Sequence, residues 1–436
     1  MTVNHVVKSE GQTNSKPLIS HAWIIEHLLW IQPALWALVV VSAFVYGYHS
    51  IFWSEAQVYL IEDSWCSEGE GVGRHCFGDF GLPYNNGYQD STYVPGNIAA
   101  TNTPLMALAF ELLRMFSYNT SLALYLSVLA TCLIAPFTVS SSYVSQAKRV
   151  QLAVFFGLIS VGGIAALDRG NHVVVFVPLL VGYLLSIERK RWLQAAIFLA
   201  LMSMMKFWGF IFVIALIAKS KFRYAVGSML VGGVTSVIVL SYFPGPLSIT
   251  MTNMLKAAGD QDFSRRVMNF AISIKGLVGR TGCLLRGELN CNSAIQRWEF
   301  ITGPWLGLVI AISLIVFVYV LIRVRIVPPI LWMSVLISLG IIAVPDGPIY
   351  QASLVTAIVA LLTLLPNSDS LENWKWSSRL LIMAIIFSSS PLTIYLAGEP
   401  FPFRSYYLTI PSAWLVFYFT ILIELALLCR KGVARK

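Results

Sequence analysis

The stretch "LQAAIFLALMSMMKFWGFIFVIALIA", residues 193–218, decides how this chain is threaded. Its 26 residues exceed the length of about 20 apolar residues that crosses a bilayer. However, Lys206 lies at the middle of the stretch, and Gly209 follows shortly after it. The stretch is therefore either one span or two short half-helices that turn back near Lys206.

Five short basic segments decide between these two threadings. They read "QAKR" (146–149), "ERKR" (188–191), "KSKFR" (219–223), "RVR" (323–325) and "CRKGVARK" (429–436). Cytoplasmic loops of membrane proteins carry an excess of Lys and Arg. A single span at 193–218 would move "KSKFR" and "RVR" to the opposite face. The charge pattern thus predicts a helical hairpin whose tip at Lys206 lies toward the non-cytoplasmic side.

The composition of the whole chain is typical of a membrane protein. The 436 residues are 57% hydrophobic and 12% charged, whereas soluble proteins carry about a quarter charged residues. Only helices and closed barrels can span lipid, and continuous apolar runs favour helices. Besides the hairpin, we predict spans at 29–50, 121–144, 152–167, 172–187, 226–245, 303–322, 329–345, 349–365, 379–396 and 411–428.

The predicted fold is an all-α polytopic membrane protein with about twelve transmembrane segments. It forms a single integral membrane domain over residues 1–436, with a cytoplasmic N-terminal tail at 1–21 and a cytoplasmic C-terminus. The net charge of +9 is spread over short clusters at the ends of apolar runs. Because no basic stripe or nucleic-acid-binding motif is visible, we expect no nucleic-acid partner.

Two long segments, residues 51–100 and 246–300, are predicted to form outer loops. Each holds a close cysteine pair, namely Cys66 with Cys76 and Cys283 with Cys291. Pairs on the outer side suit disulfides in an oxidising compartment, and four free thiols are the alternative. No metal-ligand spacing of the C-x₂-C type is present, so we expect no zinc site. Loop 246–300 has more basic than acidic residues, which argues against its outer placement.

The first outer loop is acidic, and most of its carboxylates are interpreted as solvated charges. The set comprises Glu55, Glu62, Asp63, Glu68, Glu70, Asp79 and Asp90. Glu55 differs because it follows the first span closely, where a carboxylate at the membrane surface can take a proton from a hydroxyl group. Asp63 and Asp90 are the reserve candidates for this base. After the loop, residues 103–116 are predicted to form an interfacial or partly inserted helix. In that helix Glu111 and Arg114 are solvated partners.

The turn "DRGNH", residues 168–172, places ions between two apolar runs. In one interpretation it is an ordinary polar turn in which Asp168 caps the next helix. In the other, Arg169 and His172 stand at a helix N-terminus, which favours anions, and the planar guanidinium suits phosphate. Lys206 would reach the same level, either as a functional cation within the membrane or as a lysine that snorkels to water. The second interpretation predicts a cationic site for a lipid-linked phosphate.

The run 167–226, which begins "LDRGNHVVV", resembles the central region of glycosyltransferase family 87. The resemblance lies in an R-G-N turn, a basic turn, a lysine-centred hairpin and another basic turn. Four further segments are similar to motifs of that family: "SEAQVYLIED" (54–63), "YVPGNIAATNTPLMALAFELL" (93–113), "AISIKGLVGRTG" (271–282) and "PDGPIYQASLVTAIVALL" (345–362). Three positions depart from the family pattern. Glu55 stands where an aspartate is usual, "KFWG" lacks the common proline, and Ile349 or a neighbour replaces a late histidine.

The resemblance implies a C-type glycosyltransferase fold and a sugar donor linked to polyprenyl phosphate. A hexose such as mannose would pass, with inversion, to a glycan or glycolipid acceptor on the non-cytoplasmic face. Glu55 would be the base, and Arg169, His172 and Lys206 would hold the lipid phosphate. A divalent cation is optional, and no other cofactor is implied. We expect a multi-pass protein of the plasma (inner) membrane, surrounded by lipids, that acts in cell-envelope glycolipid biosynthesis.

Three other classes remain open from the sequence. A transporter or lipid flippase would show inverted repeats and a charged site near the midplane. An oligosaccharide polymerase or ligase would use arginine-rich outer loops, a feature that 246–300 partly shows. A structural or assembly protein would have little reason to keep Lys206 at membrane depth.

Overall fold

The computed structural model describes residues 20–46, 52–54, 77–86, 103–141, 143–242, 246–258, 272–274, 276–278, 281, 309, 312–324, 326–344, 349–365, 369–390, 392–397, 403–404 and 406–431. All structural statements below concern these residues. The predicted outer loops 51–100 and 246–300 are covered only in part.

Four described helices are long and apolar enough to cross a membrane, and a bent pair would make a fifth span. The four spans lie in α1 (His21–Tyr46), α5 (Tyr118–Thr138), α11 (Phe222–Leu240) and α19 (Tyr406–Arg430). Other apolar helices are shorter than a span: α4 (Pro104–Leu113), α8 (Phe176–Glu188), Ile312–Arg323, α16 (Pro329–Ile342) and α17 (Val355–Leu364). The protein is thus a helical membrane protein, and the count of about twelve segments stays a prediction.

The stretch 193–218 does form a hairpin. It consists of α9 (Trp192–Met205), a 3₁₀ helix η6 (Phe207–Phe212) that packs back against α9, and α10 (Val213–Ala218). Lys206 lies between the two halves in an extended conformation, with φ −148° and ψ 137°. The Nζ atom of Lys221 lies 4.7 Å from the centroid of the Trp192 ring. Because Trp192 begins the first half and Lys221 follows the second, the hairpin enters and leaves at one end.

The basic turns around the hairpin meet at that same end, called the basic end below. Nη1 of Arg323 donates to Oγ of Ser220 at 2.9 Å, which joins the segments "RVR" and "KSKFR". Nζ of Lys219 lies 5.3 Å from the Trp332 ring at the start of α16. The 14 residues of α9 rise by about 21 Å, so Lys206 lies roughly that far from the basic end.

The predicted span 152–167 is broken. Residues 146–169 form α6 (Gln146–Leu152), a π-helical turn η4 (Ala153–Leu158) and α7 (Val161–Arg169). Residues Gln146–Leu158 and Val161–Arg169 meet at 57°, so this segment is a broken span or a re-entrant loop, and the span at 152–167 stays a prediction. A π-helical turn carries an extra residue that interrupts the regular ladder, and such turns mark kinks. After α7, the chain continues into the 3₁₀ helix η5 (His172–Val175).

The predicted span 379–396 is wrong in its second half. Helix α18 (Lys375–Ser389) ends early, and Leu392–Ala397 form strand β2. Pro391 follows the helix in sequence, and a proline restricts the residue before it to extended conformations. Strand β2 pairs antiparallel with β1 (Phe52–Ser54) and with β3 (Phe403–Arg404). The described residues are predominantly helical, as predicted, and this small three-stranded sheet is the exception.

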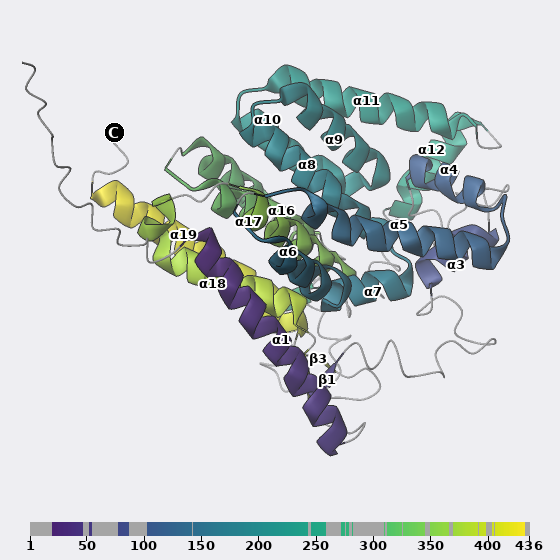
Figure 1. The fold of residues 1–436 in the computed structure, drawn as a ribbon. Helices are drawn as coiled ribbons and strands as arrows, with labels where there is room; N and C mark the ends of the chain where they lie inside the picture. Colours follow the sequence, from purple (N-terminus) through teal and green to yellow (C-terminus); the bar gives the residue numbers. More distant parts are fainter. Residues whose placement is uncertain are drawn as a thin grey trace, which may run out of the picture.

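The remaining described elements are shorter or peripheral. They are α3 (Gly78–Asn86), α12 (Leu247–Ala258), the 3₁₀ helix η8 (Ile349–Leu354) and the 3₁₀ helix η9 (Asp369–Trp374). In Figure 1, α8, α9 and α11 lie side by side in one group, and α1, α18 and α19 form another. Helices α16 and α17 contact members of both groups.

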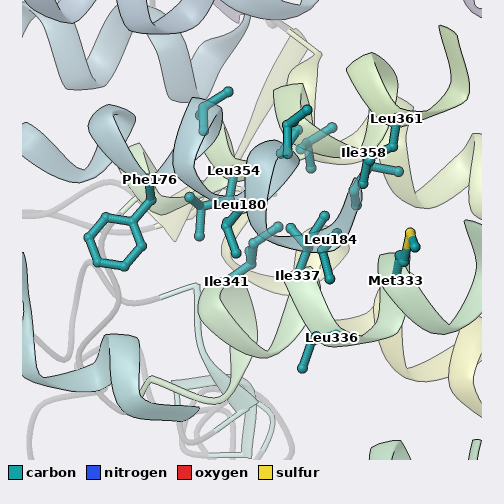
Figure 2. Packing of buried hydrophobic residues seen from close by; sticks show 14 of the residues in the cluster. Phe176, Leu180, Leu184, Met333, Leu336, Ile337, Ile341, Leu354, Ile358 and Leu361 are labelled. Carbon is teal, nitrogen blue, oxygen red and sulfur yellow. The ribbon is translucent and has the colours of Figure 1, made fainter. Parts of the chain in front are cut away.

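The apolar core lies where α8 meets α16 and α17. Figure 2 shows Leu180 and Leu184 of α8 among Ile337 and Ile341 of α16 and Ile358 of α17, all buried. By contrast, large apolar side chains cover the outer face of α11, and Leu230 there is 61% exposed. An apolar exterior over an apolar core is the arrangement that a lipid environment permits.

Candidate active site

The site begins at the turn between α7 and η5. Helix α7 ends at Gly170, whose φ of 65° and ψ of 40° lie in the left-handed region that favours glycine. The side-chain oxygen of Asn171 accepts from the backbone N–H of Val173 at 3.0 Å and so caps η5. The interpretation in which Asp168 caps this helix is wrong, because Asp168 still belongs to α7. Its carbonyl oxygen accepts from the backbone N–H of Phe77 at 2.6 Å.

Asp79 joins the two polar side chains of this turn. One carboxylate oxygen accepts from Nη2 of Arg169 at 2.8 Å, and the other accepts from Nδ2 of Asn171 at 2.6 Å. The Arg169 and Asp79 side chains keep 27% and 21% of their exposure, respectively. Asp79 had been grouped with the solvated loop acids, and the structure corrects this. No feature of the seven loop acids distinguishes it in the sequence, because its partners lie about 90 positions away.

Helix α3 holds Asp79 in place through its aromatic neighbours. Phe77, just before the helix, has a φ of 63°, an uncommon conformation for a non-glycine residue. Phe80 is fully buried, and its ring lies 5.1 Å from that of Tyr125 and 5.9 Å from that of Phe110. A Cβ on Gly170 would lie only 2.9 Å from Cβ of Phe80, so the two backbones approach closely here.

Lys206 reaches this cluster from the tip of the hairpin. Its side chain is half-buried, and Nζ lies 6.0 Å from the ring centroid of Tyr350. It also lies within electrostatic range of Asp79. The Oγ1 atom of Thr103 donates to the carbonyl oxygen of Met205 at 2.9 Å, which fixes the chain just before Lys206. The structure thus places Lys206 within electrostatic range of the carboxylate that pairs with Arg169.

His172 lies beneath these groups and is 3% exposed. Its Nε2 atom has no hydrogen-bond partner among the described residues, and its ring is within electrostatic range of Lys206. A buried polar atom without a partner is costly and often marks a binding site or an ordered water. The three predicted phosphate-binding residues therefore gather in one place.

Tyr350 is a member of the site that the sequence identified only as a neighbour of Ile349. It lies in η8, within electrostatic range of Asp79, Arg169 and Asn171. Helix η8 reaches the site because it packs directly on α7. A Cβ at Gly162 would overlap the backbone of Ala352 and Ser353, so only glycine allows this approach.

Several predicted residues lie outside the described residues. These are the base candidates Glu55, Asp63 and Asp90 and the cysteines Cys66, Cys76, Cys283 and Cys291. Strand β1 ends at Ser54, directly before Glu55, and Ser54 pairs with Leu392 of β2. In the part of the chain that is described, no three His, Cys, Asp or Glu side chains form a group that could hold a metal ion.

The flanking helix α4 forms within the predicted stretch 103–116, and its placement at the membrane interface stays a prediction. It begins at Pro104 after Thr103, and Arg114 pairs with Glu111 at 3.0 Å. Both side chains of this pair are partly exposed, at 29% and 36%. The pair is a surface ion pair of the kind that contributes little stability.

The arrangement can bind an anionic group at the end of the hairpin opposite the basic turns. Arg169 offers a planar donor set, Lys206 offers a mobile ammonium, and Asn171 begins a short helix. Charges that surround such a site act more strongly where water is excluded. The chemistry that fits is the binding of a phosphate and the stabilisation of negative charge that develops on it.

The family model that matches this chain is that of glycosyltransferase family 87, over residues 100–345. The matched segment covers more than half of the 436 residues and contains Arg169, His172 and Lys206. Asp79 and Tyr350 lie outside it. The comparisons with curated proteins and with solved structures gave no match.

Proposed function

Because the chain belongs to glycosyltransferase family 87, a family of membrane glycosyltransferases, we propose that it transfers a sugar from a polyprenyl-phosphate donor. The sugar is a hexose such as mannose, and the acceptor is a hydroxyl group of a glycan or glycolipid. Transfer takes place on the non-cytoplasmic face of the plasma (inner) membrane and inverts the anomeric centre.

One observation carries this proposal, namely the convergence of Arg169, His172 and Lys206 beside Asp79 and Tyr350. The cluster lies about 21 Å from the basic end, which supports a position near the opposite membrane surface. A donor whose phosphate sits at that surface keeps its polyprenyl tail in the lipid.

In the proposed reaction, the acceptor oxygen attacks the anomeric carbon on the face opposite the phosphate. The bond between that carbon and the phosphate oxygen breaks, and its electron pair stays on the phosphate. Glu55 takes the proton of the acceptor hydroxyl, with Asp63 and Asp90 as the reserve candidates. Arg169 and Lys206 stabilise the charge that develops on the departing phosphate, a role that groups placed before the reaction perform well. Phosphate is a good leaving group, so no general acid is needed.

The proposed binding of the donor phosphate gives a reason for the lysine at the tip of the hairpin. Its tip must hold a charged lysine at membrane depth, which is costly unless the group has a function or a partner. Tyr350 and Asp79 supply partners for Lys206 before the donor arrives. The donor phosphate then adds a second anion to this cation. A divalent cation stays optional in this scheme, and no step depends on it.

The test is transfer of radiolabelled sugar from a polyprenyl-phosphate donor by the purified full-length protein. Lys206→Ala is expected to lower kcat/KM by at least about 100-fold, the size typical of removing one group that stabilises developing charge. Glu55→Gln is expected to abolish transfer while donor binding persists. Lys221→Ala is the matched control, because it removes a cation from the same hairpin at the basic end.

Unchanged transfer in Lys206→Ala and Glu55→Gln would refute the site. Movement of an intact lipid or solute across the membrane without any transfer would instead favour a flippase or transporter. Repeated addition of one unit to a growing chain would favour a polymerase.

A further inference from the structure

Asp79 is an acidic side chain held among the cations of the proposed phosphate site. Its carboxylate contacts Arg169 at 2.8 Å and Asn171 at 2.6 Å, and it acts electrostatically on Lys206. A carboxylate in this position repels every anion that enters the site. Its presence there needs a reason beyond the binding of phosphate.

The charges of the site suggest that reason. Among the three charged side chains Arg169, Lys206 and Asp79, the two cations bring two positive charges and the carboxylate one negative charge, so these three sum to a single positive charge. A phosphodiester, such as a sugar linked to a lipid through phosphate, carries one negative charge. It would neutralise this site.

The product of transfer is different. Once the bond from the anomeric carbon to the phosphate oxygen breaks, the lipid keeps a phosphomonoester, while the proton of the acceptor passes to the base. The second ionisation of a phosphomonoester has a pKa near 6, so at pH 7 or above the product carries close to two negative charges. Asp79 repels this dianion about twice as strongly as it repels the donor, because Coulomb energy scales with the product of the charges.

Building on the proposed function, we propose that Asp79 is the specificity-determining residue that lowers the preference of the phosphate site for a doubly charged phosphomonoester relative to a singly charged phosphodiester. It does so by holding one edge of Arg169 and by lowering the positive charge of the site. The same contacts to Arg169 and Asn171 keep the turn in one geometry. Asp79 thereby limits the extra affinity that the doubly charged product would otherwise have over the singly charged donor.

The test uses two ligands that differ by one charge and cannot transfer a sugar. Geranylgeranyl phosphate is the monoester, and its methyl ester is the diester with the same tail. Their Kd values are measured by titration calorimetry with the full-length protein in nanodiscs at pH 8, where the monoester is a dianion. The readout is the ratio of the two Kd values, which a merely structural loss of the site would leave unchanged.

In Asp79→Asn, which keeps the shape of the side chain, the ratio is expected to shift by about tenfold toward the monoester. Asp79→Glu keeps the charge and should keep the wild-type ratio, even where both ligands bind more weakly. Glu111→Gln is the matched control, because it removes the acid of another ion pair, with Arg114 at 3.0 Å, and should not change the ratio.

An unchanged ratio in Asp79→Asn would overturn the inference, since Asp79 would then serve only to position Arg169. Wild-type protein that binds neither ligand would refute the phosphate site and this inference with it. Wild-type protein that binds both ligands but transfers no labelled sugar would refute the transferase proposal alone, and the shifted ratio would still establish the role of Asp79.

Discussion

Gly170 shows how a single residue holds the proposed site together. Its left-handed backbone ends α7 and lets Arg169 and Asn171 reach the same carboxylate. Its missing side chain also lets Phe80 of α3 pack against the turn. Glycine has both properties because it lacks a side chain, so Gly170 both adopts the left-handed backbone and leaves room for Phe80.

We predict that Gly170→Ala destabilises the protein by about 1 to 2 kcal/mol from the left-handed backbone, with a further loss from the contact with Phe80. Transfer should fall as well, because Arg169 and Asn171 shift relative to Asp79. The measurement is thermal unfolding and sugar transfer in detergent. Gly227→Ala is the control, since a Cβ there meets nothing within 4 Å, and it should be neutral or slightly stabilising. Equal behaviour of the two variants would contradict this account.

The sequence identified Arg169, His172 and Lys206 because an ion within an apolar run is conspicuous. It did not identify Asp79, because a carboxylate in an acidic loop resembles its neighbours. Its role depends on a contact across about 90 positions with Arg169. Tyr350 was missed for a similar reason, since an aromatic residue in an aromatic-rich chain carries no signal until η8 is placed against α7.

At the scale of elements, the contact between α7 and η8 brings Tyr350 to Lys206. The two helices touch backbone to backbone at Gly162, and Oγ1 of Thr356 donates to the carbonyl oxygen of Phe156 at 2.6 Å nearby. This pair of contacts joins segments about 200 positions apart. It sets the distance between the two halves of the proposed site.

Gly162→Ala is expected to push η8 away from α7 and to cost about 1 to 3 kcal/mol, as overpacking of a tight interior does. Donor KM should rise because Tyr350, carried by η8, moves away from Arg169 and Lys206. Unfolding temperature and donor KM are the readouts. Gly233→Ala, on the open face of α11, should change neither of them. A wild-type KM in Gly162→Ala would show that this contact does not position the site.

Helices and turns were predictable from the sequence where basic segments or the length of an apolar run distinguished one threading from another. The hairpin was predicted from the basic segments. Its two ends, at Trp192 and Lys221, lie together as a hairpin requires. The bend at η4 and the strand β2 were missed because continuous apolar composition does not separate a straight span from a broken one, or a helix from a buried strand. Proline at 391 was the available sign that α18 ends early.

In the proposed threading, the whole molecule has two chemically different ends. Lys221 lies at the basic end beside Trp192, and Lys206 lies near the other end of the hairpin. The apolar exterior of helices such as α11 separates the two ends. By the positive-inside rule we expect the basic end to face the cytoplasm.

Single cysteines introduced at Trp208 and at Ser220 should react with membrane-impermeant maleimide from opposite sides of sealed vesicles. The first should react only from the non-cytoplasmic side and the second only from the cytoplasmic side. A variant in which all six native cysteines are replaced provides the background. Labelling of both positions from one side would refute the proposed threading.

The cysteine pairs of the two outer loops give a second prediction at this scale. If the loops face an oxidising compartment, as predicted, peptide mapping without reduction should recover Cys66 linked to Cys76 and Cys283 linked to Cys291. Replacing one member of a pair should free its partner for alkylation. Alkylation of all four cysteines in the untreated protein would place these loops on the reducing side or leave them unpaired.

The central claim is that the groups around Arg169 and Lys206 hold the phosphate of a lipid-linked sugar. The most direct measurement is a cryo-electron microscopy map of the full-length protein bound to a non-hydrolysable analogue of a polyprenyl-phosphate sugar. We predict phosphate density within hydrogen-bond reach, about 3 Å, of both Arg169 and Lys206, with the sugar directed away from the basic end. Phosphate density at the basic end, or away from these two residues, would contradict the account.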